Sequence, residues 1–323
     1  MSLSIKRLVS KTKLPYPIFF AILCSSTYFF GVFLALLTDN LYNFFSEYGF
    51  ILLCLFGYAS GVFTIMLLNS LEASINEVRN YVVLKEEEWR SFRRKILEKA
   101  TSRIYWLVFF FWIVYSFHHI FFTKMSWWKT SYNSQFIIDL YGFIVQGING
   151  CFLGGIFMTL VSINLNLAYR EIYSNNVFST DIASSRGKRK LSKFKKLVVM
   201  ETFAAAIVSA LAISIWSKAI LYTPVIGSMI MILPTAVYPH YIFYKILSKA
   251  KEDKLDTLEE NIKKIPSREA TIGDLIQLNK LSLEIEKTKE VKPWLIDIKA
   301  VFQLLGAAVT SQTITLIIDI VTK

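Results

Sequence analysis

The polar side chains that stand out lie inside the last apolar stretch of the chain. Residues 300–318 carry no formal charge and are long enough to cross a bilayer. The amides and hydroxyls in this stretch belong to Gln303, Thr310, Ser311, Gln312, Thr313 and Thr315. In hydrocarbon such groups turn toward neighbouring helices or toward water, so the stretch has side chains that could line an aqueous path. The alternative is a helix packed inside a bundle, with its hydroxyls bonded to carbonyls four residues earlier.

No catalytic constellation is recognisable in the sequence. Its histidines are His118, His119 and His240. The first two are adjacent, so on a helix they point in different directions and make a poor metal pair. A phosphate-binding P-loop, a glycine-rich dinucleotide turn and a Gly-x-Ser-x-Gly elbow are all missing from the sequence. We therefore expect a protein that is not an enzyme and that uses no metal or other cofactor.

A second set of polar and aromatic residues favours small-molecule binding. The set falls in the outer halves of the spans predicted below and comprises Tyr28, Tyr58, Tyr115, His118, Tyr141 and Gln146. Small ligands usually bind in a concave apolar pocket with a few polar groups. These residues therefore predict a crevice open to the outside, although ordinary helix packing is the alternative for each. Two carboxylates, Asp139 and Glu201, lie near the ends of their spans, and we expect them to extend to the interface rather than to relay protons.

Composition predicts the scaffold that must hold these residues. The 323 residues are 54% hydrophobic with a mean hydropathy of +0.45, which is more apolar than a soluble domain. We predict an all-α, polytopic membrane protein that forms a single domain over residues 1–323, because continuous apolar runs of roughly 20 residues span bilayers as helices. The predicted spans are 17–37, 48–69, 104–122, 136–163, 197–217, 224–244 and 300–320. The first run is interpreted as a span rather than a cleavable signal.

The distribution of positive charge predicts the orientation. Of the 36 Lys and Arg residues, 32 lie in the N-terminal segment and in segments 70–103, 164–196 and 245–299. Positive charge marks the cytoplasmic face, so the N-terminus is expected inside and, after seven spans, the C-terminus outside the plasma membrane. The basic segments also suit contact with anionic lipid. No soluble basic domain is evident, so we expect the lipid bilayer, and not nucleic acid, as a partner.

Local patterns predict cytoplasmic helices and close helix contacts. The segment 86–95 is a charged helix candidate with Glu and Arg four residues apart. A helix start is predicted near Ser267, and the apolar positions of 272–283 suit a helix packed on one side. We expect spans four to seven to extend as helices into the cytoplasm. The pairs Gly57-x-x-x-Gly61 and Gly150-x-x-x-Gly154 permit close helix contact.

The C-terminal residues carry a further motif. Ile296-Asp297 is followed after nine residues by Gly306-Ala307 and then by Thr310. In these residues the chain resembles the insect gustatory and odorant receptor superfamily and its gustatory-receptor-like relatives. That family continues with Tyr after the Thr and then with Gln-Phe, where this sequence has Ser311 and Ile317-Ile318. The predicted topology also matches that of the family.

The resemblance implies a ligand-gated cation channel. Family members are tetramers whose seventh helices surround a central pore, so a homo- or hetero-tetramer with a small-molecule ligand is expected. Carried over by position, the pore and gate residues are Thr310, Ile314, Ile317 and Asp319. Rings of Ile314 and Ile317 would gate by dewetting, and a ring of Asp319 would favour cations at the outer mouth.

Three alternatives remain open from sequence. A divergent receptor-like protein that keeps the fold without conducting is compatible with the departures at Ser311 and Ile317-Ile318. A G-protein-coupled receptor would need an outside N-terminus, against the charge distribution. A transporter would be favoured by repeated halves or by broken helices with buried charge.

Overall fold

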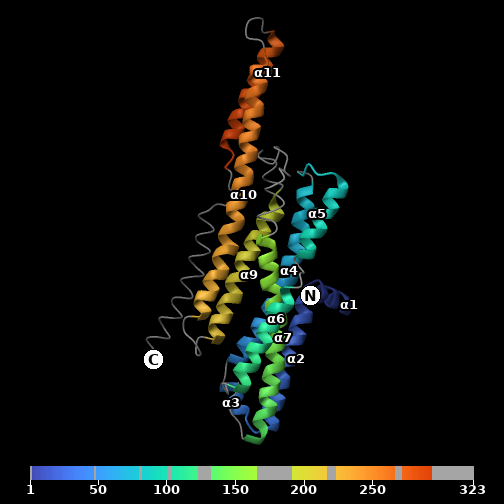
Figure 1. The fold of residues 1–323 in the computed structure, drawn as a ribbon, viewed down its shortest axis with the longest axis vertical. Coiled ribbons are helices and arrows are strands. Elements are labelled where there is room, and N and C mark those ends of the chain that lie inside the picture. Colours follow the sequence, from blue (N-terminus) through green and yellow to red (C-terminus); the bar gives the residue numbers. More distant parts are fainter. Residues whose placement is uncertain are drawn as a thin grey trace, which may run out of the picture.

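The computed structural model describes residues 2–46, 49–79, 82–99, 104–122, 132–165, 191–216, 223–265 and 271–292. Every secondary-structure element in this part of the chain is a helix, which agrees with the predicted all-α class. The helices form an elongated bundle (Figure 1). In order, they are α1 (Ser2–Thr12), α2 (Tyr16–Leu37), α3 (Leu41–Ser46), α4 (Gly49–Val78), α5 (Glu86–Lys99), α6 (Ile104–Phe117), the π-helical turn η2 (His118–Phe122), α7 (Tyr132–Leu165), α9 (Ser192–Trp216), α10 (Thr223–Lys263) and α11 (Ile272–Glu290).

Two of these helices are long and apolar enough to cross a membrane, among the residues that the structure describes. They are Tyr16–Leu37 in α2 and Phe50–Glu77 in α4. The surface of α2 exposes large apolar side chains, including Phe29 at 67% and Leu37 at 65%. Exposed apolar surface of this kind is unfavourable in water, and lipid tails would cover it. The two helices therefore indicate association with a membrane.

A Schellman turn ends α2 and reverses the chain into α3. Asp39 adopts a left-handed conformation with φ of 54°. The Asp39 amide donates to the Leu36 carbonyl at 3.2 Å, and the Asn40 amide donates to the Ala35 carbonyl at 2.8 Å. These two bonds satisfy carbonyls that the helix end would otherwise leave unpaired.

The largest core cluster joins α4, α5, α7, α9 and α10. Its fully buried members include Leu67 and Leu71 of α4, Leu197 of α9 and Leu247 of α10. Trp89 of α5 packs against the same cluster and is 6% exposed. The core therefore ties the charged helix α5 to the end of the bundle at which α4 stops.

Small residues allow the close helix contacts predicted from sequence. An ideal Cβ at Gly57 of α4 would lie 2.0 Å from Asn149 Oδ1 of α7, and one at Gly150 would lie 2.1 Å from the ring of Trp112 of α6. Any larger residue would collide there, so these glycines set the distance between neighbouring helices. The predicted close contact is confirmed for Gly57 and Gly150.

Helices α10 and α11 form an antiparallel pair that projects from one end of the bundle (Figure 1). The side chain of Lys254 pairs with Glu284 at 2.9 Å. The helix start predicted at Ser267 lies outside the described residues, and the observed N-cap is Thr271. Because Lys254 faces Glu284 and the two helices are antiparallel, Ile272 at the start of α11 lies beyond Lys263, the last residue of α10. Ile272 is accordingly 79% exposed. Leu275, Ile276, Leu278 and Leu283 are exposed as well, so the predicted packing of the apolar face of 272–283 on one side is wrong along most of its length.

Candidate functional site

The predicted pore lies outside the described residues. This holds for Thr310, Ile314, Ile317 and Asp319, and for the motif that precedes them. The predicted ligand-binding residues, by contrast, all lie in α2, α4, α6, η2 and α7.

Two of the predicted ligand-binding residues meet in one aromatic cluster. The rings of Tyr28 and Tyr141 both pack on Phe50, with centroid distances of 6.0 Å and 5.7 Å. The Tyr141 hydroxyl donates to the Thr27 carbonyl across the α2–α7 contact. An ideal Cβ at Gly31 would lie 2.9 Å from the Tyr141 hydroxyl. The cluster is therefore closely packed around these two tyrosines.

The other four predicted ligand-binding residues are dispersed. Tyr58 packs with a separate cluster of α1, α2, α4 and α7. Gln146 is buried, and its backbone carbonyl accepts a hydrogen bond from Trp112 Nε1 at 2.8 Å. Tyr115 is 45% exposed, and His118 is exposed with its ring stacked on Phe122 at 5.7 Å. The structure thus brings together Tyr28 and Tyr141, but not the whole set.

Glu201 is a polar residue whose burial the sequence did not reveal. It is 0% exposed, and neither of its carboxyl oxygens has a hydrogen-bond partner among the described residues. Buried residues of α9 flank it one turn away on either side, including Leu197, Ala204 and Ala205. The expectation that Glu201 extends to the interface is wrong, because α9 begins at Ser192 and holds Glu201 on the face that packs into the core. The sequence signal for this burial is the spacing of three or four residues that separates Glu201 from the apolar residues Leu197, Ala204 and Ala205.

Asp139 differs from Glu201 in having a partner. It is half-buried and accepts a hydrogen bond from Gln135 Nε2 at 2.9 Å. The donor lies four residues earlier on α7, so the pair satisfies itself on one helix face. Asp139 therefore has no comparable need for a further partner.

A second concentration of charge lies where α4 meets α5. Glu72 of α4 pairs with Arg93 of α5 at 2.8 Å and with Lys6 of α1 at 3.2 Å. Glu86 is shared by Arg79 at 3.1 Å and Arg90 at 3.2 Å. The second of these pairs is the predicted spacing of four residues. Each carboxylate is thus shared by two cations.

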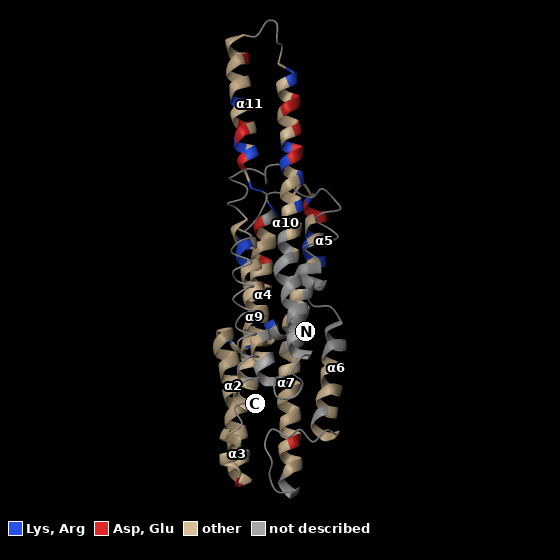
Figure 2. Cartoon of the chain, turned by 90° about the vertical axis from the view of Figure 1, so that its left-hand side faces the viewer, with Lys and Arg blue, Asp and Glu red and all other residues tan. Residues whose placement is uncertain are grey.

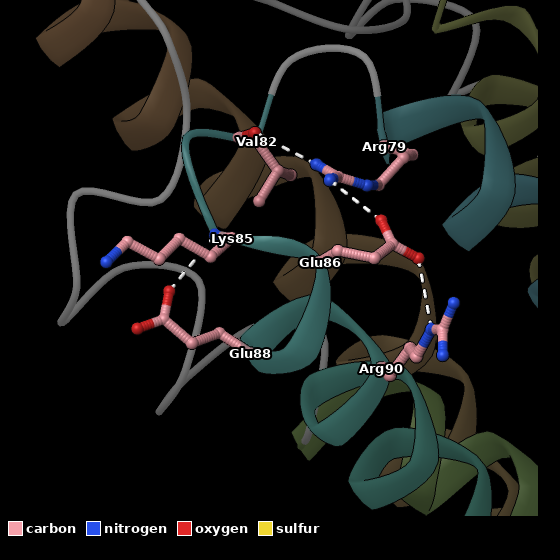
Figure 3. A network of polar contacts seen from close by, with 6 residues as sticks. All are labelled: Arg79, Val82, Lys85, Glu86, Glu88 and Arg90. Atoms are coloured by element: carbon pink, nitrogen blue, oxygen red, sulfur yellow. Dashed lines mark hydrogen bonds and ion pairs between the residues drawn. The ribbon is translucent and has the colours of Figure 1, made fainter.

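Figure 3 shows the network around Glu86 at the start of α5. Hydrogen bonds from Arg79 and then from Arg90 lower the pKa of Glu86 below its usual value. The side chain of Glu88 accepts from the Lys85 amide at 3.1 Å, which satisfies a backbone donor at the helix start. Acidic residues in this first turn also complement the helix dipole.

Comparison with protein-family models, curated proteins and solved structures finds no match to this chain. Its class therefore follows from its own geometry. The fold and the two long apolar helices define an all-helical, membrane-associated protein. Among the residues that the structure describes, it carries a buried carboxyl without a hydrogen-bond partner on α9 and a network of ion pairs where α4 meets α5.

Proposed function

We propose that the chain is a multi-pass protein of the plasma membrane with seven spans, its N-terminus in the cytoplasm and its C-terminus outside. Successive long helices run in alternate directions between the two ends of the bundle (Figure 1). The shorter helices α5 and α11 do not cross the bundle but fold back at one of its ends. Lys, Arg, Asp and Glu gather on α5, α11 and the adjoining part of α10, whereas α2, α3 and the lower part of α7 carry few (Figure 2). The Lys and Arg residues among them support a cytoplasmic location for this end, because positive charge marks the cytoplasmic side.

Within this topology, we propose a receptor-like, ligand-gated cation channel of gustatory-receptor-like type. The observation that carries the proposal is the terminal motif, in which Ile296-Asp297, Gly306-Ala307 and Thr310 keep the family spacing. In a tetramer, Ile314 and Ile317 would ring the pore and Thr310 would lie deeper on the same helix. Asp319 would attract cations to the outer mouth. The cluster of Tyr28 and Tyr141 is the proposed wall of the ligand site.

The test measures currents from the full chain in lipid bilayers or in expressing cells. Ile317→Gln should raise basal cation current, because a polar ring wets a constriction that isoleucine keeps dry. Leu316→Gln is the matched control, since its position falls on the other side of the helix. Equal effects of the two substitutions, or monomeric particles on imaging, would contradict the central pore. An external C-terminal epitope in intact cells is expected, and an internal one would overturn the topology.

A second candidate function is supported by Glu201. An acidic group buried in a membrane bundle commonly marks a proton or ion pathway, and a transporter would use such a group. A proton-coupled transporter should take up protons with its substrate in reconstituted vesicles, and Glu201→Gln should abolish this uptake. In the channel, the same substitution should leave cation conductance intact, so the two functions give opposite results with one variant.

A further inference from the structure

A cavity of about 380 Å³ lies between the end of α4 and the outer face of α5. We call it the α4–α5 cavity. Asn76 of α4 lines one wall, and α5 supplies the remaining described residues, which are Glu86, Trp89, Arg90, Arg93, Arg94 and Leu97. It opens to the surface, because Arg90 is 77% exposed and Glu86 is 57% exposed. Its volume lies within the range of small-ligand sites.

The wall of the cavity is dominated by guanidinium groups. Arg90, Arg93 and Arg94 follow the same face of α5, and Arg93 Nε is buried without a hydrogen-bond partner among the described residues. The Arg79 guanidinium lies 5.4 Å from the centre of the Trp89 ring, which holds a fourth arginine beside the cavity. Guanidinium groups present paired N–H donors that match the oxygens of phosphate.

The lining of the cavity carries more positive than negative charge, because its described residues include Arg90, Arg93 and Arg94 but one carboxylate, Glu86. Glu72 is shared by Lys6 and Arg93, and Glu86 is shared by Arg79 and Arg90. Two other acidic side chains of this region make bonds elsewhere. Glu77 accepts from Ser192 Oγ and the Lys193 amide, and Glu88 accepts from the Lys85 amide. Three arginines against one carboxylate in the lining leave an excess of positive charge at the cavity, which an anion would balance.

The position of the cavity selects the kind of anion. It adjoins the last turns of α4, at the charged end of a helix that is long and apolar enough to cross a membrane. Trp89 and Phe92 hold α5 against the core next to that helix. A bilayer with α4 as a span would place anionic headgroups at this level.

We propose that the α4–α5 cavity binds the phosphate group of an anionic phospholipid. Arg90 and Arg94 hold the phosphate oxygens, and Arg93 Nε supplies a buried donor. Glu86 remains ionised between Arg79 and Arg90 and orients the Arg90 side chain. The inference needs α4 in the bilayer, but it does not depend on whether the protein conducts ions.

The test uses the purified full-length protein in neutral detergent and measures its apparent melting temperature. Dioctanoyl phosphatidic acid should raise the melting temperature of the wild type in a saturable way, because a ligand that binds the folded state stabilises it by mass action. Dioctanoyl phosphatidylcholine should not. Arg90→Gln combined with Arg94→Gln should raise the half-saturating concentration of phosphatidic acid roughly tenfold or more, since charge-assisted bonds are lost.

Two matched variants make the result specific. Lys195→Gln combined with Lys196→Gln removes the same charge from exposed positions near the start of α9, and it should leave the half-saturating concentration unchanged. Arg90→Lys combined with Arg94→Lys keeps the charge but loses the paired donors, and it should lie between wild type and the glutamine pair.

Three outcomes would overturn the proposal. One is a wild type that phosphatidic acid does not stabilise. Another is equal weakening by the Arg90/Arg94 and Lys195/Lys196 glutamine pairs, which would assign the effect to net charge alone. The third is an equal shift with inorganic phosphate at the same concentration, which would show that the cavity binds free phosphate rather than lipid. A glutamine pair that melts early without lipid is replaced by the lysine pair for this comparison.

Discussion

Replacing Glu201 by leucine should make the protein more stable. The side chain is fully buried on α9, and neither carboxyl oxygen has a partner among the described residues. Leucine has a similar size and suits the surrounding face formed by Leu197, Ala204 and Ala205. Glu201→Leu therefore removes two unsatisfied acceptors without leaving a large cavity.

The magnitude follows from the cost of the orphaned group. A buried polar group without a partner costs about 1–3 kcal/mol, and more if it is charged. Removing it should raise the free energy of unfolding by about 2 kcal/mol, which corresponds to roughly 4 °C in melting temperature for a domain of this size class. The apparent melting temperature of the purified protein in detergent measures the effect.

The control is a surface glutamate on the neighbouring helix. Glu259 of α10 is exposed, so Glu259→Leu should change stability by no more than about 0.5 kcal/mol. A fall in melting temperature for Glu201→Leu would refute the reasoning, because it would show that the carboxyl is bonded to a partner in the membrane. A rise accompanied by loss of transport or current would show that the buried acid is kept for function at the expense of stability.

Four further predictions concern single contacts. Gly57→Ala should lower the melting temperature, because the new methyl would lie 2.0 Å from Asn149 Oδ1; overpacking costs about 1–3 kcal/mol, and Asn149→Ala in the same chain should restore part of the loss. Thr271→Ala should speed amide exchange at the start of α11, because it removes half of a capping box with Asp274; unchanged exchange would show that the cap contributes nothing. Hydrogen bonds from Thr271 lower the pKa of Asp274. Their stabilisation of α11 is therefore fully present above the ordinary Asp pKa of about 3.9 and is lost as pH falls through the lowered pKa. Amide exchange at the start of α11, corrected for its intrinsic pH dependence, measures this loss. Lys251→Met should speed amide exchange at the C-terminal end of α11 alone, because Lys251 Nζ donates to the carbonyls of Lys289 and Val291 at 2.6 Å and 3.0 Å. A uniform change in amide exchange along α11 would contradict this role of Lys251.

Helix positions were predictable from sequence wherever apolar residues are continuous. The first predicted span, 17–37, corresponds to α2 at Tyr16–Leu37, and the third, 104–122, corresponds to α6 with η2. Uninterrupted apolar residues leave the backbone no competing hydrogen-bond partners, so both class and length are determined locally. That each of the predicted runs spans a bilayer stays a prediction; among the described residues, α2 and α4 meet the length and hydropathy requirement for a span.

Helix ends beyond the apolar runs were less predictable. The sequence predicts the second span at 48–69, but α4 continues to Val78. Charged residues such as Glu72 and Glu77 propagate a helix well in water, so hydropathy does not report where the helix stops. This extension carries the residues that meet α5, which is why the α4–α5 cavity could not be inferred from the sequence.

The sequence predicts side-chain partners within one helix, but it does not predict partners that depend on the packing of two helices. The four-residue spacing of Glu86 and Arg90 was sufficient for their ion pair, because one helix brings them together. The pairing of Glu72 with Arg93 joins two helices across a turn and leaves no periodic signal. The cap of α11 is Thr271, which the sequence does not single out, because its role depends on the reciprocal hydrogen bonds with Asp274.

Helix α4 connects the features that the proposals depend on. Near one end it contacts the aromatic cluster through Phe50, in its middle Gly57 meets α7, and at the other end Glu72 pairs with α5 and α1. A shift of α4 along its axis would collide at Gly57, because no space separates that position from Asn149. The tight contact at Gly57 therefore holds the tyrosine cluster and the α4–α5 cavity at a fixed separation. A lipid phosphate bound between α4 and α5 would consequently stabilise the same helix against which Tyr28 and Tyr141 pack.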